Sequence, residues 1–145
     1  MPNAGYSKKS LAEKLGLKPE MHAVAINAPV HYPSLLESEF PHLKFSLPRK
    51  ELIPFIHFFA TEAKEIEKQL PKIKAHMLPN ALLWISWPKK ASGVPTNLDE
   101  NIVRDLGLAG GLVDVKVCAV DETWSGLKFV FRLKDRPSAN STTPK

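Results

Sequence analysis

The strongest constraint on the fold is an apolar segment near the middle of the chain, residues 81–87, with the sequence Ala-Leu-Leu-Trp-Ile-Ser-Trp. It has the length of one strand and lacks polar alternation, which is typical of a strand buried on both faces of a sheet. The segment ends abruptly at Pro88, and Lys89 and Lys90 follow. This pattern indicates a central strand of an open α/β sheet that leads into a basic surface loop.

Five other segments are apolar, or alternate between apolar and polar residues, over the length of a strand. They are residues 22–27, 44–47, 55–60, 113–120 and 127–134. Capping signals and the helical spacing of apolar residues predict four helices. These lie between Ser10 and Gly16, over 32–38, from Thr61 to Met77, and from Thr96 or Asn97 to Gly110. We expect Pro71 to kink the third helix rather than divide it.

Strands and helices in this order predict a three-layer, Rossmann-like α/β sheet of about six strands, mostly parallel. Only residues 121–126 connect the last two strands, which is too short for a crossover, so these strands are expected to form an antiparallel hairpin. Lysines on the last strand are expected to protect an edge of the sheet. We expect one domain over residues 1–136 and a disordered tail, rich in Ser, Thr and Asn, over 137–145.

Composition and charge narrow the class of protein. The 145 residues, 43% of them hydrophobic, suffice for one domain with its own core. There is one cysteine and no apolar segment as long as a signal or membrane helix, so we expect a cytoplasmic protein without membrane association. Of the net charge of +5, residues 128–145 carry +4. Because this charge lies on one strand and a tail, a nucleic-acid partner is not expected.

In a sheet of this kind, ligands bind beyond the carboxyl ends of the parallel strands, where the strand order reverses. Four segments should meet on that rim, namely residues 27–31, 61–62, 87–96 and 121–126. Their lysine, imidazole, amide, hydroxyl, carboxyl and indole groups suit a small anionic or planar ligand. The candidate ligand-binding residues are Asn27, His31, Trp87, Lys89, Lys90, Ser92, Thr96, Asp121, Trp124 and Ser125.

Several candidates also have a purely structural interpretation. Lys89 and Lys90 fit a solvated loop, and Trp124 fits an indole that packs on the sheet. His57 and Cys118 each lie within a predicted strand, and we interpret both as core residues. The five histidines lack metal-ligand spacing, and the sequence has no nucleophile elbow, phosphate-binding loop or paired-carboxylate signature. We therefore assign no catalytic residue and no metal site.

A nucleotide cofactor places two requirements on this fold. The turn after the first strand is normally rich in glycine, and an acidic residue after the second strand binds the ribose hydroxyls. Residues 27–33 contain no glycine, and the second predicted strand ends in Leu47-Pro48-Arg49. Because neither requirement is met, we predict no cofactor.

Three segments resemble one protein family. They are Ala4-Gly-Tyr-Ser7, Trp84-Ile-Ser-Trp-Pro-Lys-Lys-Ala-Ser-Gly93, and residues 108–129 with the core Val-Lys-Val-Cys-Ala-Val-Asp-Glu-Thr-Trp-Ser-Gly. Up to about Arg136, the chain resembles an uncharacterised bacterial family known as domain of unknown function 3052. The resemblance implies a small cytoplasmic protein of unassigned activity. The strand order also resembles a trimmed class I S-adenosylmethionine-dependent methyltransferase, although the two cofactor positions depart from that family.

Two hypotheses about function, from different classes, follow. The first is a non-catalytic Rossmann-like module that binds a small anionic ligand or a partner protein through the rim. The second is an enzyme of unassigned reaction, with Lys89 or Lys90 stabilising charge and His31 or Asp121 carrying a proton. A homodimer is a further hypothesis, because the short strand at 44–47 leaves one edge of the sheet unguarded.

Overall fold

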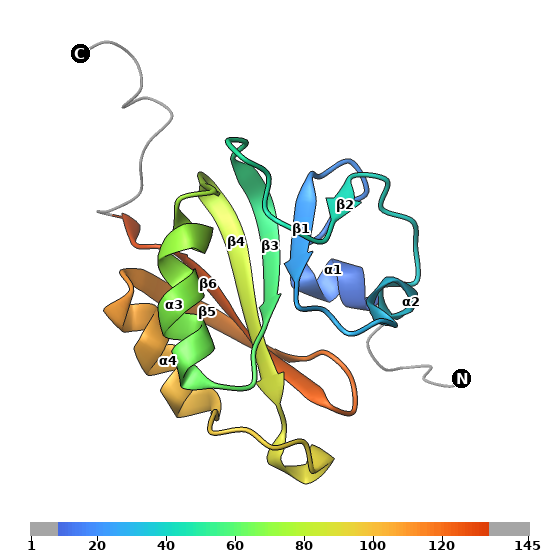
Figure 1. Ribbon diagram of the computed structural model, residues 1–145. Helices are drawn as coiled ribbons and strands as arrows, with labels where there is room; N and C mark the ends of the chain where they lie inside the picture. Colours follow the sequence, from blue (N-terminus) through green and yellow to red (C-terminus); the bar gives the residue numbers. More distant parts are fainter. Residues whose placement is uncertain (1–8, 134–145) are drawn as a thin grey trace, which may run out of the picture.

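A six-stranded sheet with helices on both faces forms the centre of the computed structural model, which describes residues 9–133 (Figure 1). The strands are β1 (Ala23–Ile26), β2 (Leu43–Lys44), β3 (Ile53–Phe59), β4 (Met77–Pro88), β5 (Leu112–Ala119) and β6 (Trp124–Phe131). The helices are α1 (Leu11–Leu15), α2 (Tyr32–Leu36), α3 (Ala63–Lys74), the short 3-10 helix η1 (Lys90–Ser92) and α4 (Glu100–Ala109).

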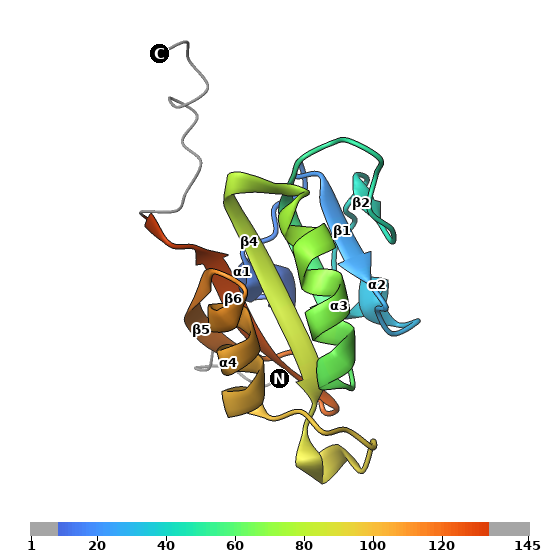
Figure 2. The same cartoon turned by 60° about the vertical axis from the view of Figure 1, so that its left-hand side comes forward.

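The strand order is β2-β1-β3-β4-β6-β5. The first four strands in this order are parallel, and β6 runs antiparallel to both of its neighbours. The structure therefore confirms the mostly parallel α/β sheet that closes in an antiparallel hairpin. Helices α3 and α4 cover one face of the sheet, and α1 and α2 lie on the other (Figures 1 and 2).

Strand β4 has a buried side chain on each face, as its apolar sequence predicts. Leu83 and Ile85 belong to the core cluster beneath α3 and α4. Trp84 belongs to the cluster beneath α1 and α2, and its indole N–H donates to the carbonyl oxygen of Leu15 at 2.8 Å. Because each face is covered, the strand can carry apolar residues without alternation.

Several helix boundaries differ from the prediction, among them the end of α2, which is Leu36 rather than residue 38. Helix α3 is one helix through Pro71, as expected, but its N-cap is Glu62 rather than Thr61, with a reciprocal capping box to Glu65. Met77 begins β4 instead of ending the helix, because apolar spacing alone cannot separate a helix from the strand that follows it. The N-cap of α4 is Asp99, whose carboxylate accepts from the backbone N–H of Ile102 at 2.8 Å.

The last strand differs more substantially. It covers Trp124–Phe131 rather than 127–134, and it lies inside the sheet between β4 and β5. The expectation that its lysines protect a sheet edge is wrong, since the hairpin folds back and places Leu127 and Phe129 in the core. The edges are β5 and the two-residue β2, which is shorter than predicted.

Some predictions fall wholly or partly on residues that the structure does not describe. These are the disordered tail at 137–145, Lys134 of the predicted last strand, and the segment Ala4–Ser7. Among the described residues, none of the helices combines the length and the apolar character needed to cross a membrane.

Candidate functional site

The strand order reverses at β1, which pairs with β2 on one side and β3 on the other. The four loop segments expected at the carboxyl ends of the strands contact one another there. The backbone N–H of Lys89 donates to the carbonyl oxygen of Thr123 at 2.8 Å, and the hydroxyl of Thr96 donates to the carbonyl oxygen of Thr61 at 2.6 Å. The contact between His31 and Asp121 joins the fourth segment, residues 27–31, to the other three.

Asp121, in the loop between β5 and β6, is the centre of this rim. Its Oδ2 lies 3.1 Å from Nε2 of His31, which follows β1. Its Oδ1 accepts the backbone N–H groups of Thr123 and Trp124 at 2.8 and 2.7 Å. Its backbone carbonyl oxygen accepts Nζ of Lys89, which follows β4, at 2.7 Å. One residue thus holds three loops together, and we name His31, Lys89 and Asp121 the rim cluster.

The hydrogen bonds keep the Asp121 carboxylate charged. Partial burial by itself would raise its pKa, but the hydrogen bonds from His31, Trp124 and Thr123 outweigh that effect and lower it. The side chain of His31 is 51% exposed, whereas that of Asp121 is 16% exposed. The imidazole is therefore the more accessible member of the pair.

Other predicted site residues support the loops internally. The hydroxyl of Ser92 donates to the carbonyl oxygen of Lys89 at 2.6 Å and accepts the N–H of Val94, which stabilises the turn after β4. Thr96 accepts the N–H of Leu98 in addition to binding Thr61. These two hydroxyls have structural partners, and we assign them to loop geometry.

The tryptophans and the remaining candidates lie in different environments. Trp87 is 5% exposed and packs in the core beneath α3 and α4, because β4 extends to Pro88 and places this indole on the same face as Leu83 and Ile85. Trp124 and Ser125 belong to β6, and the Trp124 indole packs edge-on against Phe59 at 5.0 Å between ring centroids. Lys90 is exposed in η1. Trp87 therefore does not belong to the rim surface.

Asn27 borders a neighbouring hollow that sequence reasoning missed. With Pro33, Val30 and Phe45 it lines an open pocket at the ends of β1 and β2. Val30 is 97% exposed and Phe45 53% exposed. Asn27 itself has a φ of 58°, a left-handed conformation that asparagine tolerates better than most residues. The sequence carries no signal for this surface, because the exposure of Val30 and Phe45 is visible only in the structure.

At the positions that hold a nucleotide in related folds, this chain has other residue types. The turn after β1 has no glycine, and Phe45 and Ser46 rather than an acid follow β2. At the N-terminus of α3, the backbone N–H of Ala63 donates to the side chain of Asn97 at 2.9 Å, and Glu65 supplies the capping carboxylate. The free N–H groups that attract an anion to a helix start are thus partly satisfied by the protein itself.

Behind the rim lies a fully buried polar network. The Tyr32 hydroxyl is 2.9 Å from Nδ1 of His57, and Nε2 of His57 is 2.7 Å from the Ser86 hydroxyl. His57 and Ser86 are 0% exposed. Burial lowers the pKa of His57 to about 3, so the imidazole is neutral at pH 7. The interpretation of His57 as a hydrogen-bonded core residue is confirmed.

Cys118 is buried in the core cluster beneath α1, as predicted. Burial raises the pKa of its thiol, and the nearby Lys14 and Lys116 only partly oppose that effect. Across residues 9–133, His, Cys, Asp and Glu side chains form no group of three that could hold a metal ion.

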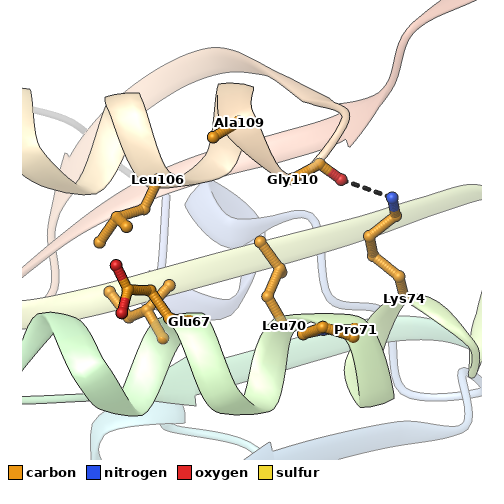
Figure 3. Close-up of a pocket in the computed structure, with 8 residues that line it drawn as sticks. Glu67, Leu70, Pro71, Lys74, Leu106, Ala109 and Gly110 are labelled. Atoms are coloured by element: carbon orange, nitrogen blue, oxygen red, sulfur yellow. Dashed lines mark hydrogen bonds between the residues drawn. The ribbon is translucent and has the colours of Figure 1, made fainter.

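A second cavity lies between α3 and α4, and no residue of the rim cluster lines it (Figure 3). It has a volume of about 280 Å³, and its apolar lining includes Leu70, Pro71 and Leu106. Lys74 closes one end by donating from Nζ to the carbonyl oxygen of Gly110 (Figure 3). Since the lysine is used to join the two helices, we interpret this cavity as a groove of helix packing.

Comparisons with solved structures identify the fold. A SAM-dependent methyltransferase from Aquifex aeolicus superposes with a TM-score of 0.61 over 82% of this chain and 86% of that chain, at 18% identity. The magnesium protoporphyrin IX methyltransferase of Synechocystis, solved with bound SAM, gives a TM-score of 0.57 over 84% of this chain and 74% of its own, at 9% identity. A putative methyltransferase from Thermoplasma acidophilum gives 0.53 over 81% and 70%, at 10% identity.

No family model matches the sequence, and no curated protein is similar to it. Similarity to domain of unknown function 3052 therefore stays a prediction. At these low identities, the structural neighbours show that the chain has the Rossmann-like fold of class I methyltransferases.

Proposed function

We propose that the protein is a non-catalytic module of methyltransferase-like fold that binds a small anionic ligand at the rim cluster. The observation that carries the proposal is the convergence of Lys89 and His31 on Asp121. Lys89 uses one of its three N–H donors on the Asp121 carbonyl oxygen, and within residues 9–133 the other two have no protein partner. Lys90 adds an exposed ammonium at the next position. A carboxylate or phosphate group matches these donors.

The hydrogen bonds of the Asp121 carboxylate support a role in ligand binding rather than in proton transfer. Three hydrogen bonds already stabilise its charged form. An acid whose charge is so well satisfied is a poor proton donor near neutral pH. Its role in this proposal is to hold the loops that carry Lys89 and His31.

Differential scanning fluorimetry and calorimetry against nucleotides, S-adenosyl compounds, acyl phosphates and sugar phosphates test the proposal. We expect at least one of these anions to raise the Tm, and Lys89→Met to weaken its binding by roughly tenfold or more. Lys64→Met, on the exposed face of α3, is the matched control and should bind as the wild type does. If none of the compounds raises the Tm, or if Lys89→Met binds equally well, the small-anion proposal is wrong.

An enzyme using the same rim is the alternative, and the His31–Asp121 pair is the observation that favours it. If Nε2 of a neutral His31 donates to Asp121, Nδ1 keeps a lone pair that can accept a proton from a bound ligand. Incubating the identified ligand with the protein and following it by mass spectrometry would detect turnover. In this alternative, His31→Gln abolishes turnover while binding persists, whereas an unchanged ligand would exclude the enzyme.

We also propose three further properties of the protein. These are membership of the bacterial family named above, a cytoplasmic location, and a partner protein or second copy at the rim or the β2 edge. The edge strand β2 has only two residues, so it offers little backbone for strand addition. Light scattering at several protein concentrations tests the homodimer, and a monomer throughout would contradict it.

A further inference from the structure

A cluster of lysines, separate from the rim cluster in sequence, lies on the sheet face that carries α1. Lys116 of β5 and Lys128 of β6 are directly paired across the two strands. Lys128 also pairs with Trp84 of β4, and its Nζ lies 5.9 Å from the centroid of that indole. Lys14, in the last turn of α1, lies close enough to Cys118 on the same face to act on its thiol, as Lys116 does.

The pairing of Lys116 with Lys128 is electrostatically unfavourable. Like charges directly opposite each other in an antiparallel pair destabilise the sheet. Burial and the neighbouring Lys116 both lower the pKa of Lys128, so its charge is held at a cost. Within residues 9–133, Lys14, Lys116 and Lys128 form no ion pair with a carboxylate. The Lys128 ammonium does make an attractive cation–π contact with Trp84.

We propose that Lys14, Lys116 and Lys128 form a binding site for a small phosphate-bearing anion on the open face of the β5–β6 hairpin. A multiply charged anion between these ammonium groups would replace their repulsion by attraction. Lysine binds phosphate as a compact point charge. Three lysines match a doubly charged phosphate better than they match a singly charged carboxylate. The three lysines come from two strands and one short helix, which is less than the extended basic surface typical of a nucleic-acid site, so we expect a small anion.

The site predicts opposite effects of one substitution on stability and on binding. Lys116→Met removes the repulsion with Lys128 while it keeps an unbranched side chain, so the variant without anion should have a higher Tm than the wild type. The same variant should bind the anion at least tenfold more weakly. A lysine that is merely solvated would show neither effect.

Calorimetry with pyrophosphate, in a phosphate-free buffer at low salt, is the direct test. The wild type should bind, Lys116→Met and Lys128→Met should each lose at least tenfold in affinity, and raising the salt concentration should weaken binding. Lys64→Met, on the exposed face of α3, is the control for a surface lysine and should bind pyrophosphate as the wild type does.

Three results would overturn the inference. The first is a wild-type protein that does not bind pyrophosphate, and the second is binding that survives both hairpin substitutions. The third is binding of a short single-stranded oligonucleotide without binding of pyrophosphate, which would indicate a nucleic-acid surface instead.

Discussion

At the scale of single residues, the buried imidazole of His57 links the stability of the protein to pH. Its pKa is lowered from 6.5 to about 3 in the folded state. As the pH falls below 6.5, the unfolded chain binds a proton at this residue that the folded chain does not. The contribution of a neutral His57 is therefore complete above pH 6.5 and is lost progressively towards pH 3, by at most about 1.4 kcal/mol per pH unit.

His57→Gln tests this link, because glutamine keeps a hydrogen-bonding side chain but does not titrate. The variant should be less stable than the wild type at pH 7, since the bonds to Tyr32 and Ser86 are disturbed. Between pH 6 and 4 its free energy of unfolding should fall less steeply. Urea unfolding at several pH values measures both quantities, and parallel curves for the two proteins would rule out His57 as the source.

Gly107 is a second residue with a defined role. It lies on the buried face of α4, where an added Cβ would collide with three atoms of the Phe129 ring. Alanine is the better helix former, but the collision with a buried ring outweighs that gain. We expect Gly107→Ala to lower the free energy of unfolding by about 1–3 kcal/mol in chemical denaturation. Asp105→Ala, exposed on the same helix, should change it by less than about 0.5 kcal/mol.

At the scale of elements, the start of α4 depends on one side chain. The Asp99 carboxylate accepts the N–H of Ile102, and Asp99→Ala should lower the free energy of unfolding by about 1 kcal/mol. Asp99→Asn keeps the accepting oxygen and should retain most of the stability. Thermal unfolding of the three proteins gives the comparison. A loss of equal size in both variants would show that the charge, and not the hydrogen bond, is what matters.

Elements were the part of the fold most accessible from the sequence. The apolar run of β4, the glycine at the end of α1 and the continuous apolar stripe of α3 through Pro71 each carry a local physical signal. Boundaries were less accessible where two signals compete, as with Thr96 and Asn97, whose capping side chains are used to join loops. Local sequence propensity does not indicate whether such a side chain caps its own helix or forms a hydrogen bond with a distant loop.

At the scale of the whole molecule, the position of β6 and the face of Trp87 could not be predicted. Both depend on register and strand order, which arise from pairing between distant segments. The meeting of His31, Lys89 and Asp121 could be anticipated, because strand ends gather at one rim in any sheet of this class. The pocket beside Asn27 and Phe45 required the structure.

The fold as a whole yields one prediction about S-adenosylmethionine. The neighbours of this chain include a methyltransferase solved with that cofactor bound, yet the turn after β1 has no glycine and no acid follows β2. We expect millimolar S-adenosylmethionine to leave the Tm unchanged, because a ligand raises the Tm only if it binds the folded state. A Tm that rises with the concentration of S-adenosylmethionine would contradict this expectation and would favour methyl transfer as the function.

The interior position of β6 has a consequence for how the chain is made. The ribosome releases β4 well before Trp124–Phe131 exist, so the most apolar strand must wait with one edge open for its antiparallel partner. Such an edge recruits other chains. We therefore expect this edge of β4 to stay open in the nascent chain until Trp124–Phe131 pair with it.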